Sequence, residues 1–294
     1  MSAPPKNRLF VEPGRMARSP NTSLRHPRSG VGIPSTLRNF WAILRTARVP
    51  SKRALAAFAK LHGHRLERRW PFFPKSDESG LNLGFDDVLE FQYARSRSFF
   101  VLVVGAYDGV ENDPVSRFVL GHDCSGVFVE PQPLVFTRLR ENLGVNPNFH
   151  IVNAAVGQVT GSREFFYVPR DTKGLPPWTE QLASFHREHI AKHEDRVPGL
   201  SEHIRSTSVN TISFGDLLDK FQIRAIDVLQ VDAEGNDAML LSWFPFDRLK
   251  PGVVHYEIAH MSAKDLDATR ARLKGFGYRR YRPVSPMDEM AVLI

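Results

Sequence analysis

Short apolar runs alternate with amphipathic segments along the last two thirds of the chain. Five of these runs have the length of a strand, and they cover 99–104, 126–130, 149–157, 225–232 and 252–260. The first run, FFVLVV, is purely apolar, which is typical of a strand that is covered on both faces of a parallel sheet. We therefore expect these runs to form the central sheet of one domain.

The segments between the runs predict helices. One ends near Leu120, and others cover 133–143, 235–243 and 263–273. In 133–143 we expect Leu134, Leu139 and Leu143 to face inward. Two short closing strands, YRRYRPV and MAVLI, form an antiparallel pair in this interpretation. The alternation predicts an α/β fold with a mostly parallel, doubly wound sheet.

The N-terminal part has a different pattern. Residues 1–35 are rich in Pro, Arg, Ser and Gly without a hydrophobic period, which predicts a disordered basic arm. Residues 36–96 predict a helical extension, with helices over 36–48 and 51–69, and a linker. The main domain is then 97–294, with an insertion at about 158–210.

The net charge of +7 is the sum of two unequal parts. Residues 1–70 hold 15 Lys and Arg against two acids, whereas the rest of the chain has a balance of −6. The arm either binds a polyanion, an anionic lipid surface or an import receptor, or it is a solvated extension that pads the domain.

The remaining composition excludes several classes of protein. A single cysteine, Cys124, excludes an internal disulfide framework and a multi-cysteine zinc site. No uncharged apolar stretch approaches the roughly 20 residues that a membrane-spanning helix needs. We therefore expect a cytoplasmic protein without a firm membrane or nucleic-acid partner.

Two features follow the first two strands, where ligands bind in sheets of this kind. The loop Gly105-Ala106-Tyr107-Asp108-Gly109 does not fit a dinucleotide fingerprint, because Tyr107 and Val110 occupy two of its three glycine positions. Its glycines still allow a ligand to approach the backbone. Glu130, at the end of the second strand, can accept hydrogen bonds from the two hydroxyls of a ribose.

The segments VLVVGAYDG, VFVEPQP, RLRENL, IVNAAVG and IDVLQVDAEGNDAMLL occur in this order between residues 101 and 241. In order and spacing the chain resembles the FkbM-type S-adenosylmethionine-dependent methyltransferases, over roughly residues 97–294. VDAEGND (231–237) is the most specific element. The resemblance implies a Rossmann-like class I methyltransferase fold, S-adenosylmethionine as methyl donor, and a hydroxyl oxygen as acceptor, often on a sugar or a natural product.

The resemblance also implies roles for individual residues. The donor would be bound by the glycine loop and by residues that follow the second and third strands: Gly105, Tyr107, Asp108, Gly109, Glu130, Pro131, Asn153, Ala154 and Ala155. Asp232 and Glu234 would lie near the reacting centre. The family usually carries an aspartate two residues before the first glycine, where this chain has Val103. In this interpretation Asp108 replaces that aspartate as the acidic contact to the methionine portion of the donor.

Three clusters contain groups that can take a proton from a hydroxyl acceptor. Asp232 and Glu234 follow the fourth strand, although acids at this place can instead cap the next helix. His255, Glu257 and His260 end the fifth strand, and we prefer Glu257 and His260. His186, His189 and His193 recur at helical spacing in the insertion, either as acceptor-binding groups, with His193 a candidate base, or as an exposed helix face.

The hypothesis is therefore an O-methyltransferase that acts on a hydroxyl of a sugar, glycolipid or other small molecule. Two alternatives stay open: a non-catalytic protein of the same fold with a decayed donor pocket, and a nucleic-acid methyltransferase steered by the basic arm. Four residues after the fourth and fifth strands, Asp232, Glu234, Glu257 and His260, could converge on one divalent ion, but nothing in the spacing requires one, and no metal is expected.

Overall fold

The protein is described by a computed structural model that covers residues 84–281 and 287–293, with the exception of 112 and 171. The predicted arm, the two predicted N-terminal helices and almost all of the predicted linker lie outside the described residues. No helix in the described part of the chain has the length and apolar character needed to cross a membrane.

A seven-stranded sheet forms the centre of the fold, in the order β10-β11-β9-β8-β1-β2-β3. Its strands are β1 (Phe100–Val104), β2 (Ser125–Val129), β3 (Phe149–Val152), β8 (Val228–Val231), β9 (Val253–Glu257), β10 (Tyr278–Tyr281) and β11 (Asp288–Leu293). β1 pairs in parallel with β2 and β8, whereas β11 is antiparallel to β9 and β10. The mostly parallel sheet and its antiparallel closing pair are therefore confirmed.

Within the described residues, six helices pack on the two faces of the sheet: α3 (Phe85–Arg95), α4 (Pro114–Leu120), α5 (Pro133–Leu143), α8 (Phe214–Lys220), α9 (Asp237–Trp243) and α10 (Ala263–Gly275). Because side chains alternate along a strand, Val101 and Val103 of β1 pack into the core that α3, α4 and α5 share. Leu102 and Val104 face the opposite core, with α8, α9 and α10. The doubly wound arrangement follows from this alternation.

Two details of the expected elements are wrong. Leu134 is 68% exposed, and the inner face of α5 is instead formed by Val135, Leu139 and Leu143. A spacing of four residues keeps these three on one stripe of the helix, whereas Leu134 lies on another side. α3 lies within the segment 36–96, and its residues Phe85, Val88 and Leu89 are part of the main core.

The run 149–157 was expected to be one strand and is two. β3 ends at Val152, and β4 (Ala155–Gly157) belongs to a second sheet of order β4-β7-β5-β6. The chain leaves the main sheet at Asn153, whose side-chain amide donates to the carbonyl oxygens of Glu130 and Pro131. This break sends the following residues over the end of the sheet.

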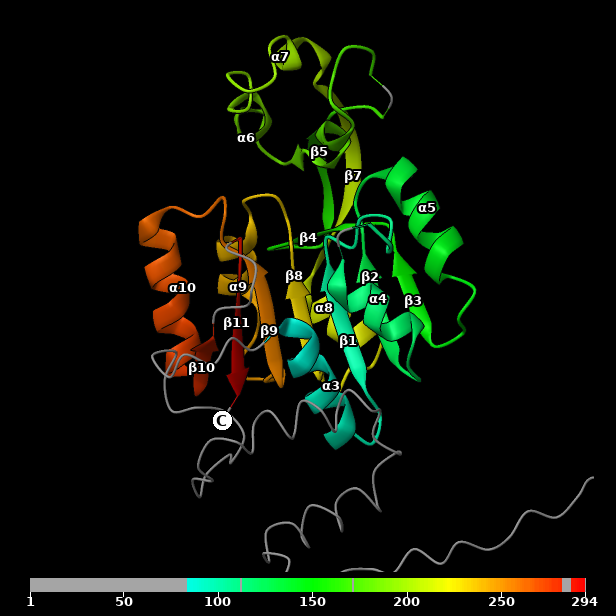
Figure 1. The fold of residues 1–294 in the computed structure, drawn as a ribbon, viewed down its shortest axis with the longest axis vertical. Helices are drawn as coiled ribbons and strands as arrows, with labels where there is room; N and C mark the ends of the chain where they lie inside the picture. Colours follow the sequence, from blue (N-terminus) through cyan, green and yellow to red (C-terminus); the bar gives the residue numbers. More distant parts are fainter. Residues whose placement is uncertain (1–83, 112, 171, 282–286, 294) are drawn as a thin grey trace, which may run out of the picture.

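The predicted insertion forms most of the second sheet together with short helices. It contains β5 (Gly161–Tyr167), a 3₁₀ helix η2 (Pro177–Gln181), β6 (Ala183–Ser184), α6 (Arg187–Ala191), α7 (Leu200–His203) and β7 (Arg205–Ser213). Figure 1 shows this unit beyond the carboxyl ends of β1 and β8. A small core of its own, including Leu182, Ile190 and Leu200, holds it together.

Candidate active site

An open cavity with an empty volume of about 950 Å³ lies between the carboxyl ends of the central strands and the insertion. This is where the strand order reverses around β1, the usual ligand crevice of a doubly wound sheet. The cavity brings together many of the residues expected from the sequence: Gly105, Tyr107, Glu130, Pro131, Ala154, Ala155, Asp232 and Glu234.

Gly105 begins the loop after β1 and has a left-handed φ of 79°. A Cβ at this position would lie 1.7 Å from the carbonyl oxygen of Asp232, so only glycine fits. The N–H of Asp232 donates to the carbonyl oxygen of Val104 at 3.0 Å. The two loops that follow β1 and β8 are thus in direct backbone contact at the cavity.

Glu130 is buried at the end of β2. Its carboxylate accepts hydrogen bonds from the backbone N–H groups of Tyr107, at 3.1 Å, and Gln132, at 2.8 Å. Burial raises the pKa of Glu130 to about 8, although these two donors and the charge of Arg138 oppose the rise. An acceptor group is therefore held in a fixed position on the cavity wall.

Three residues expected to bind the donor shape the loops instead of lining the cavity. Oδ1 of Asp108 accepts from the N–H groups of Val110 and Glu111 in its own loop. Gly109 has a φ of 74° and packs so closely on α5 that a Cβ would come within 2.8 Å of Leu139. Asn153 makes the strand break described above. Asp108 is thus engaged by its own loop.

Two buried polar residues that the sequence did not indicate, Gln230 and Asp113, also line the cavity. Nε2 of Gln230 donates to Oδ1 of Asp113 at 3.0 Å. Val103 pairs with Gln230 across β1 and β8 and is itself buried in the apolar core. Burial raises the pKa of Asp113. Gln230 interrupts the apolar strand VLQV, and a polar residue at such a place is a sequence signal that could have identified it.

The insertion also contributes to the cavity wall, through residues that the sequence did not indicate. Gln181, Ala183 and Phe185 line the cavity beside Phe165 of β5. Glu180 of η2 accepts a hydrogen bond from the Tyr107 hydroxyl and forms ion pairs with Arg138 and Arg170, at 3.3 and 3.4 Å. Tyr107 therefore connects the glycine loop to the insertion through Glu180.

Asp232 and Glu234 were expected either to act in the chemistry or to cap α9. The carboxylate of Asp237 accepts from the backbone N–H groups of Ala233, at 3.2 Å, and Gly235, at 3.3 Å, so it organises the start of this helix. Glu234 has a left-handed φ of 49° and, like Asp232, lines the cavity. Both carboxylates face the ligand space.

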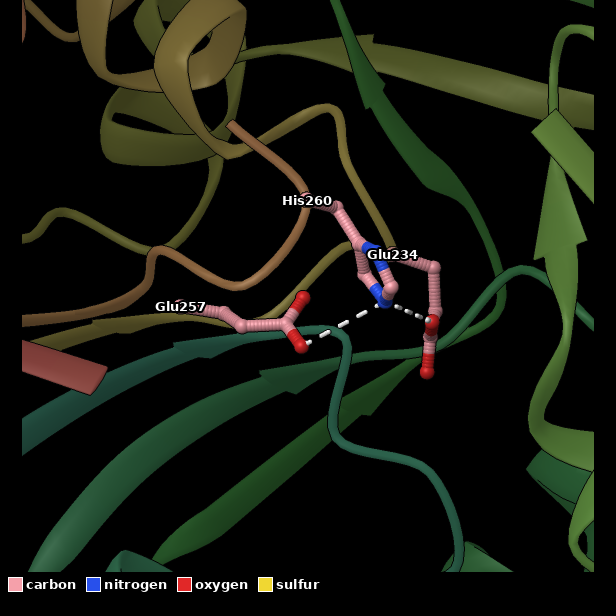
Figure 2. Close-up of side chains that lie close together, drawn as sticks. All are labelled: Glu234, Glu257 and His260. Atoms are coloured by element: carbon pink, nitrogen blue, oxygen red, sulfur yellow. Dashed lines mark ion pairs between the residues drawn. The ribbon is translucent and has the colours of Figure 1, made fainter. Parts of the chain in front are cut away.

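Glu234, Glu257 and His260 converge from the ends of β8 and β9, and Figure 2 shows both carboxylates directed at the imidazole. Nε2 of His260 lies 3.6 Å from Oε2 of Glu234 and 3.7 Å from Oε1 of Glu257. Burial and the charge of Asp232 raise the pKa of Glu234 to about 8 and that of Glu257 to about 9. Burial and the charge of Lys192 lower the pKa of His260 to about 4.

Asp232 has an altered acidity as well. Asp232 is exposed to the open cavity, but the protein around its carboxyl, with the charges of Asp288 and Asp113, raises its pKa to about 7. His255, in the middle of β9, is buried and stacks on Phe85 with ring centroids 4.0 Å apart. His255 is thus engaged by an aromatic contact, and Glu257 and His260 remain the predicted pair.

A second, smaller cavity adjoins the first one, and Ala183 and Glu234 line both. Its polar lining comes from the insertion and from the loops that follow β8 and β9: Ser184, His189, Lys192, His193, Glu234 and His260. The buried ring of His193 lies 5.7 Å from that of His260, centroid to centroid. Burial and nearby Lys192 lower the pKa of His193.

The histidine run is only partly helical. α6 contains His189, whereas His186 precedes it and His193 follows it in a series of turns. His186 and His193 therefore do not share a helix face as expected, although His189 and His193 line the same small cavity.

The strand order and the cavity at the carboxyl ends of the strands are those of a Rossmann-like α/β fold. Residues 104–280 match the family model of the methyltransferase FkbM domain, more than half of the chain. The family match makes the protein a methyltransferase, with S-adenosylmethionine as the implied methyl donor. The protein belongs to the FkbM methyltransferase family.

Comparison with curated proteins finds no match in sequence. Among solved structures, the chain is similar to a precorrin-6y C5,15-methyltransferase from Geobacter metallireducens, with 12% identity, a TM-score of 0.33, and coverage of 66% of this chain and 80% of that one. It is also similar to the METTL16 methyltransferase domain, with 11% identity, a TM-score of 0.39, and coverage of 88% of this chain and 91% of that one. A third similar structure is the Methanococcus jannaschii fibrillarin pre-rRNA processing protein, with 11% identity, a TM-score of 0.34, and coverage of 67% of this chain and 67% of that one. At these TM-scores the three structures add nothing to the family match.

Proposed function

We propose that this methyltransferase methylates a hydroxyl oxygen of a sugar, a glycolipid or another small-molecule natural product. The observation that carries the proposal is the cluster of Glu234, Glu257 and His260 at the edge of the large cavity. A hydroxyl group is a poor nucleophile until its proton has an acceptor, and this cluster offers several acceptors.

The large cavity fits S-adenosylmethionine in its chemistry. Glu130 would accept the ribose hydroxyls, and the apolar wall of Ala154, Ala155 and Phe165 would contact the adenine. Oε1 of Gln230 is buried without a hydrogen-bond partner among the described residues, so it can accept from the ammonium group of the methionine portion. The bound donor would supply a methyl group carried on a sulfonium.

The chain would contribute proton transfer and alignment. Because the pKa of Glu234 is raised to about 8, its ionised form is a stronger base than an ordinary carboxylate. His193 and His260 have lowered pKa values, so their imidazoles are neutral near pH 7 and can accept a proton, although they are weaker bases than Glu234. Holding the acceptor hydroxyl against the methyl group supplies much of the rate in such a displacement.

The polar side chains around the second, narrow cavity favour a hydroxyl-rich acceptor bound where it meets the large cavity. Ser184, His189 and His193 present hydroxyl and imidazole groups, which donate and accept hydrogen bonds without a fixed charge. Several such groups on one wall suit a polyol or a sugar better than an apolar chain.

The test is methyl transfer from labelled S-adenosylmethionine to a panel of acceptors: sugars, glycolipids, hydroxylated natural products, a protein substrate and RNA. The proposal requires label on a hydroxyl oxygen of one of the first three classes. His193→Ala and His260→Ala should lower turnover more than donor affinity, and full activity in both would remove these bases. Absence of donor binding at millimolar concentration would favour a non-catalytic protein, and label on RNA alone would contradict the proposed acceptor.

A further inference from the structure

We infer that Glu234, Glu257 and His260 form a binding site for one divalent metal ion. Each residue offers one ligand atom, and the three atoms lie within 4.8 Å of one another. Metal–ligand bonds of about 2.1 Å place two ligand atoms about 3 to 4 Å apart, so small rotations of these side chains suffice to close the site.

The ligand chemistry narrows the choice of ion. Two carboxylates and one imidazole form a mixed oxygen and nitrogen set, which suits Mn²⁺ or Zn²⁺ better than Ca²⁺, an ion that takes six to eight oxygen ligands. The three side chains remain 29%, 13% and 20% exposed, for Glu234, Glu257 and His260 respectively. Coordination positions therefore remain open for water or for a ligand.

Two further observations favour a cation at this place. Oε2 of Glu257 is buried and has no hydrogen-bond partner among the described residues, which is costly unless a ligand completes the site. Asp232, Asp237 and Asp288 also act on Glu257 electrostatically and add negative charge around it. A divalent ion would compensate this accumulation of carboxylates.

Lys192 is the competitor of the metal ion. Its Nζ lies 3.3 Å from Nδ1 of His260. When the ammonium group of Lys192 donates to Nδ1, that nitrogen is an acceptor and carries no proton. The single proton of a neutral imidazole is then on Nε2, the nitrogen that lies between the two carboxylates. A metal ion on Nε2 must displace that proton, and Lys192, which is exposed, must release Nδ1.

In the reaction proposed above, on which this role rests, the ion would hold an acceptor oxygen beside the donor cavity and lower the pKa of the hydroxyl. With the ion bound, Glu234, Glu257 and His260 would be its ligands, and the neighbouring His193 would remain to take the proton. The site itself is independent of that role, because its ligands come from the chain alone.

The experiment is titration of the chelator-dialysed full chain with Mn²⁺, without donor or acceptor, followed by the electron paramagnetic resonance signal of free Mn²⁺ and by calorimetry. One ion should bind per chain. Glu234→Gln and Glu257→Gln should weaken binding at least tenfold, whereas Glu164→Gln, at an exposed position of β5, should not change it. Zn²⁺ should displace Mn²⁺ from the same site.

Lys192→Met should tighten Mn²⁺ binding several-fold, because it removes the competing hydrogen bond. Circular dichroism of each variant checks that it folds. Absence of binding at millimolar Mn²⁺, or equal binding by wild type and by folded Glu257→Gln, would overturn the site. Unchanged or weaker binding by Lys192→Met would overturn Nε2 of His260 as a ligand. Because neither methyl donor nor acceptor is present, failure of the proposed methyl transfer would leave these results unaffected.

Discussion

Gly105 and Asp232 are in contact through their backbones, with no space for a side chain between them. A Cβ on Gly105 would lie 1.7 Å from the carbonyl oxygen of Asp232. The loop that follows β1 and the loop that follows β8 therefore determine each other's position. Since both residues line the large cavity, the contact determines the shape of the site as well as the stability of the fold.

Gly105→Ala should lower the free energy of unfolding by several kcal/mol and abolish donor binding, because it adds a clash to a left-handed backbone. Urea unfolding and calorimetry with S-adenosylmethionine measure the two effects. Gly174→Ala is the matched control: Gly174 has a similar φ of 88°, but nothing lies within 4 Å of an added Cβ. It should cost only about 1 kcal/mol. Equal effects at both positions would contradict the role of the clash.

Donor affinity should increase with pH through the titration of Glu130. Burial raises the pKa of Glu130 to about 8, so the carboxyl is largely protonated at pH 6.5 and ionised at pH 9. The ionised form accepts hydroxyl donors and attracts a cationic donor, so affinity should rise on the order of tenfold between these values. Calorimetry at a series of pH values measures this. Glu130→Gln should bind more weakly and with a flatter profile; an equally steep profile would assign the dependence to another group.

Glu180→Gln should loosen the insertion from the glycine loop. The change removes the negative charge that pairs with Arg138 and Arg170 and weakens the acceptor of the Tyr107 hydroxyl. We expect a loss of about 1–2 kcal/mol of stability and faster hydrogen exchange in η2. Mass spectrometry of exchanged peptides locates the effect. The exposed Glu164→Gln should change neither quantity, and unaltered exchange in η2 of Glu180→Gln would argue against the contact.

Glu289 should make the free energy of unfolding depend on pH in the acid range. This buried carboxylate on β11 accepts from the hydroxyl of Tyr256 at 3.0 Å and from Arg280 at 3.0 Å, and it pairs with Arg270. Burial alone would raise the pKa of Glu289, but Arg270 and Arg280 outweigh it and the pKa is lowered. The stabilisation is therefore complete above the ordinary carboxyl pKa of about 4.3 and is lost as pH falls through the lowered value.

Glu289→Gln should cost about 2–3 kcal/mol near pH 7 and flatten the loss of stability in acid. Denaturant unfolding between pH 3 and 7 tests this. Asp267→Asn is the control, because Asp267 pairs with the same Arg270 at 3.7 Å but is 80% exposed. It should cost less than 1 kcal/mol. A Glu289→Gln protein with the wild-type acid profile would contradict the assignment.

Periodicity was sufficient to predict most strands of the main sheet and the helices α4, α5, α9 and α10, but not α3 or α8. The apolar runs around β1, β2, β8 and β9 and the amphipathic α5 follow from local patterns, because burial on a sheet face requires that alternation. Local spacing did not show that Val135 and not Leu134 is the buried residue of α5. Which side of a helix is buried depends on the elements that pack against it. The break at Asn153 depends on carbonyl groups at the end of β2, more than twenty residues earlier.

The sequence by itself determined the fold class, the family and the loops that carry the site, since these depend on short patterns and on glycines that no other residue can replace. Only the tertiary structure decided which side chains meet. Gln230 with Asp113, Glu180 with Tyr107, and His260 with Glu234 and Glu257 come from separate segments, and no local pattern encodes their distances. The physical reason is that parallel strands bring their carboxyl ends to one edge, whatever the length of chain between them.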